Sequence, residues 1–439
     1  MTRELHLNAF VKPAGEYLAG WRHPDSPIDA GVNFAFVADL VRRLEAAKFD
    51  SVFLPDLVGI PDSKPEVLER VAVVNDGFEP TTLLAALSAI TTHIGLIATT
   101  STSYSEPYTV ARTFASLDHL SNGRAGWNVV TSLNDSEARN FGLDSHLGHA
   151  ERYRRAGEYF DVVSRLWDSF DDDAFERDAA TGRYFDPAKV HSLDHSGEFF
   201  KVAGPLNAPR PVQGRPVIAQ AGSSGPGRAL AARIGEIVFT RAVPIAEARE
   251  YYASIKAQAA EFGRASDELL VLPELSAVIA PTKAEAEDKF AALRELLHPR
   301  VALADVEYWL GGINLAGLPL DSPLPPLPAT NASIGTQHEI YSQAQRDNLT
   351  IGDLAKLIAD GDGALVGTPI DVADHIEEWF TTGAADGFNV SFPWLPTTLT
   401  DFTELVIPEL QRRGLFRTEY KGRTLRDNLA LSRPRSHWQ

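Results

Sequence analysis

The sequence predicts an α/β fold, namely a (β/α)8 TIM barrel with insertions. Apolar runs alternate with helical patterns over most of the 439 residues, giving about eight strand–helix units. The runs at 217–220, 237–240 and 389–392 are apolar on both faces, which is typical of buried parallel strands. Eight units favour a closed barrel over an open, doubly wound sheet.

In the amino-terminal half, local patterns place each element. The segment 34–47 is amphipathic, and 107–120 has a helical pattern that starts at a proline and closes at Ser-Asn-Gly. The segment 151–170 predicts a long helix whose core stripe is Tyr153, Phe160, Val163 and Trp167. We therefore expect strands at 5–10, 51–54, 94–98 and 125–130, and helices at 34–47, 80–91, 107–120 and 151–170.

The carboxyl-terminal half repeats the alternation. Thr282-x-x-Glu285 has capping-box spacing and predicts a helix start after the apolar run 269–280. We expect strands at 216–220, 237–240, 269–280 and 387–392, and helices at 228–234, 246–262, 282–297, 369–382 and 398–413.

Length alone would suggest two or three domains, but barrels with insertions exceed 400 residues, so we expect a single domain over 1–439. The insertion 171–206 is acidic and ends in a hairpin-like alternation, whereas the insertion 299–349 is loop-like. Its proline-rich part can form no regular element, and we expect 299–345 to be a mobile lid. The basic, aromatic tail 414–439 is expected to pack on the barrel or on a partner subunit.

Composition excludes several classes of protein. The net charge of −18 and the pI near 5.1 argue against nucleic acid or an anionic membrane as a partner. The absence of cysteine excludes disulfides, thiol nucleophiles and thiolate metal sites. There is no apolar run of the ~20 residues that a membrane span needs, and the amino terminus has no signal-peptide core. We expect a cytoplasmic protein.

Polar residues collect where the predicted strands end. Hydroxyl residues occupy 99–103, Thr131-Ser132 closes the next strand, and Asp56 follows a strand and a proline. In parallel α/β proteins ligands bind at this edge, although Asp56 is equally suited to a turn or helix cap. Asn128 is unusual inside a strand, and a buried Asn needs hydrogen-bond partners from the backbone or from a ligand.

A glycine-rich turn, Gly222 to Gly227, lies between a predicted strand and a helix, and Ser223 and Ser224 add hydroxyl donors. Such a turn can hold a phosphate at the helix amino terminus, or it can be an ordinary βα turn with a serine cap. The sequence leaves both readings open. His149 and Tyr153 lie four residues apart on one helix face and can reach a shared ligand group. No metal-ligand constellation stands out, and we expect no metal.

Four long segments together resemble the flavin-dependent monooxygenases of the bacterial-luciferase-like superfamily. The nearest group is the one that contains nitrilotriacetate monooxygenase component A and the dibenzothiophene-sulfone monooxygenases. The segments include FEPTTLLAALSAITTHIGLIATTSTSYSEPYTVARTFASLDHLSNGRAGWNVVTS, HAERYRRAGEYFDVVSRLW, HSGEFFKVAGPLNAPRPVQGRPVIAQAGSSGPGR and VGTPIDVADHIEEWF. They follow one another in the family's order and span nearly the whole chain.

The resemblance implies a barrel that binds FMN in its reduced form, FMNH2, supplied by an NAD(P)H:flavin reductase. Oxygen would add to flavin C4a, and the resulting peroxide or hydroperoxide would insert one oxygen atom from O2 into a mid-sized organic substrate. The protein would supply orientation and a dry cavity. The flavin contacts implied for this chain are Asp56, Thr102 and Asn128 at the isoalloxazine and ribityl region, with Thr100 and Ser132 nearby, and His149, Tyr153 and Ser224, with Ser223 beside it, at the phosphate end.

Catalytic residues stay unidentified by the resemblance. The substrate-pocket candidates are Phe10, Trp21, His23, Trp309, His338 and Trp394. We expect a homodimer or homotetramer. Two other functions are left open: an F420-dependent reductase or dehydrogenase of the same superfamily, and a non-catalytic flavin-binding barrel.

Overall fold

Eight parallel strands close into a barrel in the computed structural model, which describes residues 3–438 apart from 76, 223, 242, 329, 331–333 and 360–362. Neighbouring strands pair in the order β1, β2, β3, β4, β7, β8, β9 and β11, and β11 pairs back with β1. The strands are β1 (His6–Phe10), β2 (Ser51–Leu54), β3 (Gly95–Ser101), β4 (Ala125–Val130), β7 (Val217–Gln220), β8 (Ile237–Thr240), β9 (Leu270–Ile279) and β11 (Gly387–Ser391). The predicted TIM barrel is confirmed.

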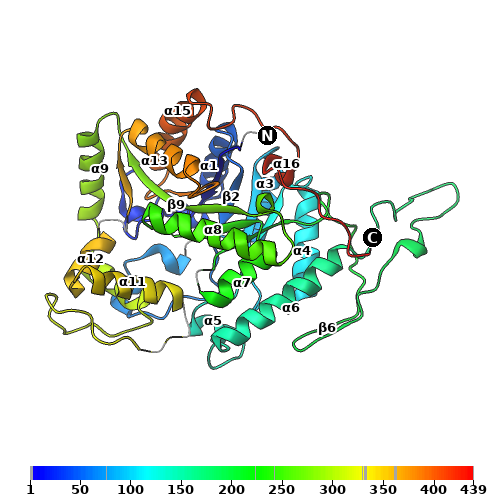
Figure 1. Cartoon of the computed structure of the whole chain (residues 1–439), viewed down its shortest axis with the longest axis horizontal. Coiled ribbons are helices and arrows are strands. Elements are labelled where there is room, and N and C mark those ends of the chain that lie inside the picture. Colours follow the sequence, from blue (N-terminus) through cyan, green and yellow to red (C-terminus); the bar gives the residue numbers. More distant parts are fainter. Residues whose placement is uncertain are drawn as a thin grey trace.

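Helices surround the barrel, as Figure 1 shows. They are α1 (Phe34–Ala46), α3 (Pro80–Ser88), α4 (Pro107–Leu120), α6 (His149–Trp167), α7 (Gly225–Ile234), α8 (Ile245–Glu261), α9 (Lys283–Glu295), α13 (Pro369–Thr381), α14 (Thr397–Asp401) and α15 (Ile407–Arg412). A π-helical segment, Phe402–Val406, joins the last two, so the expected helix 398–413 is continuous but locally widened to i→i+5 hydrogen bonding. The capping box at Thr282 and Glu285 is confirmed.

Three expectations need correction. Helix α7 begins at Gly225 rather than Arg228, because Ser224 caps it and the glycine-rich turn supplies its first residues. The stripe on α6 is only partly right: Val163 and Trp167 are buried, but Tyr153 and Phe160 are half-buried. A short strand, β10 (Leu365–Gly367), pairs in parallel with the carboxyl-terminal end of β9 and was not expected, since three residues are too few to show a period.

Side chains alternate along the barrel strands between the lumen and the helices. Leu7, Val52 and Leu96 pack outward in the large cluster beneath the helices, whereas Phe53 and Ile97 pack inward. The tail residues Leu425, Leu429 and Leu431 join the inward cluster. Because the Leu425 amide donates to the Gly123 carbonyl, just before β4, the short helix α16 (Leu425–Asn428) covers the amino-terminal end of the barrel.

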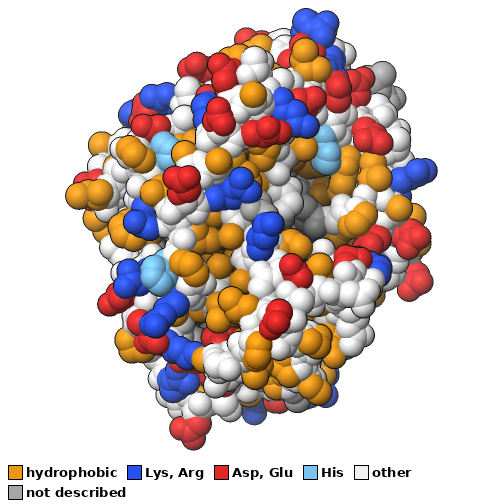
Figure 2. Space-filling model, turned by 90° about the vertical axis from the view of Figure 1, so that its left-hand side faces the viewer, with side chains coloured by type: hydrophobic (Ala, Val, Ile, Leu, Met, Phe, Trp, Pro, Cys, Tyr) orange, Lys and Arg blue, Asp and Glu red, His pale blue; other side chains and the backbone are white. Residues whose placement is uncertain are grey.

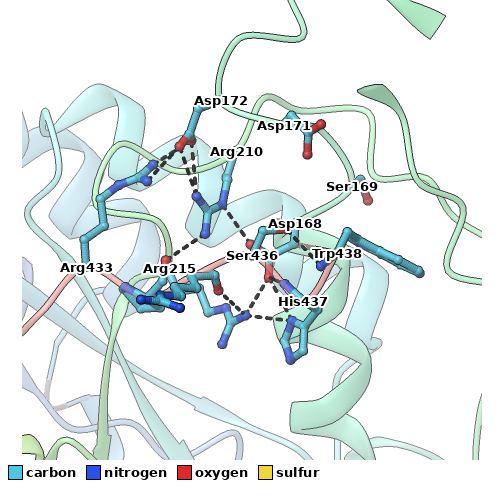
Figure 3. Close-up of polar contacts among 12 residues, drawn as sticks. Asp168, Ser169, Asp171, Asp172, Arg210, Arg215, Arg433, Ser436, His437 and Trp438 are labelled. Carbon is cyan, nitrogen blue, oxygen red and sulfur yellow. Dashed lines mark hydrogen bonds and ion pairs between the residues drawn. The ribbon is translucent and has the colours of Figure 1, made fainter. Parts of the chain in front are cut away.

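The tail continues across the surface and is tied to the segment after α6 (Figure 3). The buried carboxylate of Asp168 accepts from Arg210 Nε at 2.8 Å and from the backbone amide of His437 at 3.1 Å. Arg433 makes two bonds of 2.8 and 2.6 Å to Asp172. The tail therefore packs on its own barrel along these contacts.

The two insertions lie on opposite sides of the barrel in Figure 1. In the first, β5 (His195–Ser196) and β6 (Lys201–Val202) pair antiparallel, as the hairpin-like alternation predicts. In the second, the loop-like reading of 299–349 is wrong. The segment forms α10 (Pro299–Trp309) and α11 (Ile334–Arg346), with α12 (Ile351–Ala359) following. They share a small core of Val306, Leu310, Leu315, Ala344, Ile351 and Leu354.

The intervening proline-rich part, 319–328, has no helix or strand, as expected, and only a single bridge between Pro323 and Thr350. The prolines separate apolar positions along the sequence. These positions come into contact only in the folded protein, so the sequence pattern did not predict this core. Figure 2 shows a face on which acidic and basic side chains are interspersed among hydrophobic ones, with a hollow near its centre.

Candidate active site

The strand ends of β3 and β4 bring the first group of predicted residues together. Their register aligns Thr99 with Asn128, and Asn128 Nδ2 donates to Thr99 Oγ1 at 2.9 Å. Asn128 is buried, and its Oδ1 atom has no hydrogen-bond partner among the described residues. A buried acceptor without a partner is costly, so this atom suits a ligand that brings an N–H or O–H donor.

The hydroxyls beside Asn128 are held by the protein. Thr102 donates from both its amide, at 2.8 Å, and its Oγ1, at 3.0 Å, to the Val130 carbonyl. Ser132 adopts a positive φ of 60°, and its hydroxyl lies 2.8 Å from that of Ser101. Thr100 shares the strand face of Leu96 and Ala98, which pack outward, so it lies apart from the lumen-facing group.

Glu137 is a buried carboxylate that the sequence reasoning missed. It is 1% exposed and accepts from Ser132 Oγ at 2.9 Å and from the amides of Leu133 and Asn134 at 3.0 Å each. With Asn134 it forms the capping box of α5 (Asp135–Asn140). The Asn-x-x-Glu spacing in the sequence was the available signal. These hydrogen bonds hold the Glu137 carboxyl group next to the predicted flavin contacts.

Asp56 follows β2 at the same edge. Burial raises the pKa of its carboxyl, and with the nearby carboxylates of Glu79 and Glu137, against a backbone hydrogen bond from Leu57, the pKa reaches about 6. Asp56 therefore changes its charge just below neutrality, which suits a residue that meets a ligand with ionisable ring atoms.

His149, Tyr153 and Ser224 meet at the amino terminus of α7. Ser224 Oγ accepts from the Gly227 amide at 3.3 Å and caps the helix. A Cβ atom added to Gly227 would lie 3.0 Å from the Tyr153 hydroxyl, so that hydroxyl sits on the first turn of α7. The rings of His149 and Tyr153 are 4.9 Å apart.

This group has the features of an anion site: helix amides, a positive dipole end and hydroxyls. The turn needs its glycine, because a Cβ on Gly222 would come within 2.6 Å of the Gly227 backbone. Burial and the neighbouring Arg152 lower the pKa of His149. Ser223 lies outside the described residues.

The predicted substrate-pocket residues lie in different parts of the structure. Phe10 packs in the lumen, 5.4 Å from Phe53 and 5.9 Å from Phe239 between ring centroids. His23 stacks on Trp394 at 4.6 Å, and Trp394 is 1% exposed. Trp21 instead donates to the Arg70 carbonyl beside a shallow surface cavity of about 190 Å³. His338 is exposed on α11.

Helix α10 of the second insertion reaches over the barrel mouth. The Tyr308 hydroxyl lies beside the Asn134 side chain, beyond β4, and the Arg241 guanidinium, beyond β8, lies 5.7 Å from the Trp309 ring centre. Glu307 is 3.7 Å from Lys64, in the loop after β2. The insertion thus bridges three strand–helix loops and brings Trp309 to the mouth.

Known proteins share this architecture and sequence over nearly the whole chain. A model of the family described as Luciferase-like monooxygenase matches residues 16–386. N-acetyl-S-(2-succino)cysteine monooxygenase of Bacillus subtilis is 48% identical over 98% of both chains. Nitrilotriacetate monooxygenase component A of Aminobacter aminovorans is 45% identical over 99% of this chain and 98% of that protein. The crystal structure of riboflavin lyase with modified FMN and riboflavin superposes with a TM-score of 0.89, at 35% identity, over 97% of this chain and 95% of that one.

The chain belongs to the luciferase-like monooxygenase family, and it is a flavin-dependent monooxygenase. The family resemblance of the sequence is confirmed. Among the described residues, no helix is long and apolar enough to cross a membrane.

Proposed function

We propose that the flavin is FMN, bound in its reduced form, and that the protein uses it to insert one oxygen atom from O2 into a mid-sized organic substrate. The observation that carries this proposal is a pair of features at one barrel edge that suit the two ends of one ligand. The Asn128 Oδ1 atom has no donor in the part of the chain that the structure describes, and the capped amino terminus of α7 forms an anion cradle with Tyr153 and His149. Asn128 lies on β4, and Ser224 follows the adjacent strand β7. One ligand can therefore contact both residues.

The roles of the site residues follow from this arrangement. Asn128, Thr102 and Asp56 would orient the ring and ribityl part of FMN. Ser132 lies near this group, whereas Thr100 lies on the outward face of β3. His149, Tyr153 and Ser224, with Ser223 beside it, would hold the phosphate. The bound FMN supplies the oxygen-activating chemistry, and the protein supplies orientation and exclusion of water.

A separate NAD(P)H:flavin reductase would supply FMNH2. Support comes from the name of the relative from Aminobacter aminovorans, which is component A of its enzyme. We further propose a cytoplasmic location, where NAD(P)H is available, and a homodimer or homotetramer, which sedimentation would test.

The test combines binding and turnover. Anaerobic titration with reduced FMN, oxidised FMN and reduced F420 should show tightest binding of reduced FMN. Adding a flavin reductase, NADH and candidate substrates in air should give a product heavier by one oxygen atom. Tightest binding of F420 would instead support the F420-dependent reductase, and flavin binding without product across a broad substrate panel would support a non-catalytic barrel. Efficient NADPH oxidation by the chain alone would contradict the reductase partner.

A further inference from the structure

Glu274 places a carboxyl group in the barrel lumen, on the wall that faces the proposed flavin contacts. On β9, Leu270 and Leu272 pack inward, and Glu274 follows at the same alternation. In the barrel, three strands separate β9 from β3 in either direction, so Glu274 and the Thr99–Asn128 pair stand on opposite sides. Neither the sequence pattern nor the family resemblance pointed to this residue.

The surroundings of Glu274 favour its protonated form. Burial, together with the nearby carboxylate of Glu16, raises the pKa of its carboxyl to about 7. Three groups oppose this shift: the Ser391 hydroxyl, which donates to Glu274 Oε1 at 3.1 Å, and the cations Arg241 and Lys12. Lys12 is held by Glu16 at 2.9 Å, which weakens its effect on Glu274.

Asn389 on β11 has an amide side chain without hydrogen-bond partners among the described residues, and it lies beside this carboxyl. It pairs in register with Glu274 and with Asn8 on β1. It is 1% exposed, and neither its Nδ2 nor its Oδ1 atom has a partner among the described residues. Buried amides of this kind are satisfied by ordered water or by a ligand. A donor and an acceptor thus lie next to Glu274 and can carry a hydrogen-bonded chain.

We propose that Glu274 is the proton donor of the oxygenation reaction, supported by a hydrogen-bonded chain through Asn389. The proposal rests on the proposed function. Anionic reduced FMN, O2, substrate and one proton give oxidised FMN, oxygenated product and water. One oxygen atom enters the substrate and the other leaves as water, and two electrons come from the reduced flavin. Glu274 provides the proton that the anionic flavin lacks, and solvent restores it after each turnover.

The first test needs no flavin. Infrared titration of the flavin-free protein should show a protonated carboxyl band that disappears as pH rises through about 7 and that Glu274→Gln removes. Glu16→Gln should move this transition to lower pH, because it removes a repelling carboxylate. Ser391→Ala should move it to higher pH, because it removes a hydrogen bond to the ionised form. A band that titrates only in the ordinary range of glutamate, near 4.3, would overturn the proposal.

The second test measures product and hydrogen peroxide per oxygen consumed. In the wild-type protein the product share should fall as pH rises through the infrared transition, because Glu274 loses its proton. Glu274→Gln should give a low product share at every pH, and Glu274→Asp should restore a pH-dependent share. A wild-type product share in Glu274→Gln would overturn the proposal even if its infrared band behaves as expected.

The two proposals fail in different ways. If the wild-type protein binds no reduced FMN, the proposed function fails, whatever the infrared titration shows. If Glu274→Gln binds reduced FMN as the wild type does and keeps full coupling, only the role of Glu274 fails. Reduced-FMN affinity of each variant, measured anaerobically, therefore accompanies both tests.

Discussion

Arg426 in the tail forms a two-point ion pair with Glu236, which precedes β8: Nη1 lies 2.6 Å from Oε1, and Nη2 lies 2.9 Å from Oε2. Arg426 is 2% exposed and also donates to the carbonyls of Arg215 and Ser432. The neighbouring Leu425 packs into the barrel lumen. The tail is thus the closing element of the barrel's amino-terminal end.

We predict that Arg426→Met lowers the free energy of unfolding by about 3–5 kcal/mol, because it leaves the Glu236 charge without its cation. Urea denaturation measures the loss. The double variant Arg426→Met with Glu236→Gln should recover part of it. Lys421→Met removes an exposed tail pair with Glu4 and should cost less than about 1 kcal/mol. Equal losses at the two positions would contradict a closing role for Arg426.

Asp56→Asn should make the protein more stable at pH values well above 6. The folded pKa of Asp56, about 6, lies above its ordinary value of 3.8, so folding favours the protonated form. The stability that this carboxyl contributes is present below 3.8 and is lost as pH rises through about 6. Asparagine carries no charge and avoids this loss. Melting temperatures across this range should therefore diverge with rising pH, and a constant offset would rule out titration of Asp56 as the cause.

Ser224→Ala should weaken binding of reduced FMN by on the order of tenfold to a hundredfold, because a hydroxyl bond to a charged acceptor is worth roughly 1.5–3 kcal/mol. Reduced riboflavin, which has no phosphate, should bind almost unchanged. Ser224→Thr keeps both the hydroxyl and the cap on Gly227 and serves as the matched control. Equal weakening for FMN and riboflavin would assign Ser224 to the fold or the ring, and no weakening would leave it as a helix cap only.

Tyr308→Phe should raise the hydrogen peroxide released per oxygen consumed, because it removes the hydroxyl that α10 places beside Asn134 over the barrel mouth. Affinity for reduced FMN should stay nearly unchanged. Tyr184→Phe, at an exposed position in the first insertion, is the control and should have no effect. Unchanged peroxide release in Tyr308→Phe would argue against a shielding role for this contact.

Deleting residues 321–330 is a stronger test of the expected role of the second insertion as a lid than the substitution of Tyr308. We predict more uncoupled peroxide with FMN affinity nearly intact. The segment is not free of the insertion core: the Ser322 carbonyl accepts from the Ile351 amide at 2.9 Å, and Leu324 and Leu327 pack against that core. Loss of flavin binding or of folding after the deletion would show that the segment is structural and not a lid.

The sequence was sufficient for the barrel, for most strand and helix limits, and for the identity of the family. Periodicity and turn residues are local signals, so α4 and β8 were predicted at their observed limits. The glycine-rich turn and the serine cap of α7 are likewise local. The same locality explains the error at 299–349, where the apolar faces of α10, α11 and α12 complete each other only after folding.

What the tertiary structure decided is which polar residues meet and in which charge state. Spacing along the chain could not show that Glu137 lies among the predicted flavin contacts, that Thr100 turns outward, or that Trp21 lies apart from Phe10. Nor could it show Glu274 beside Glu16 in the lumen, since their mutual effect on protonation depends on distance and burial. The sequence by itself determined the fold through local pattern, and its resemblance to a known family indicated the chemical class. The closure of the barrel determined the site, because closure brings distant strand ends to one edge and removes their side chains from water.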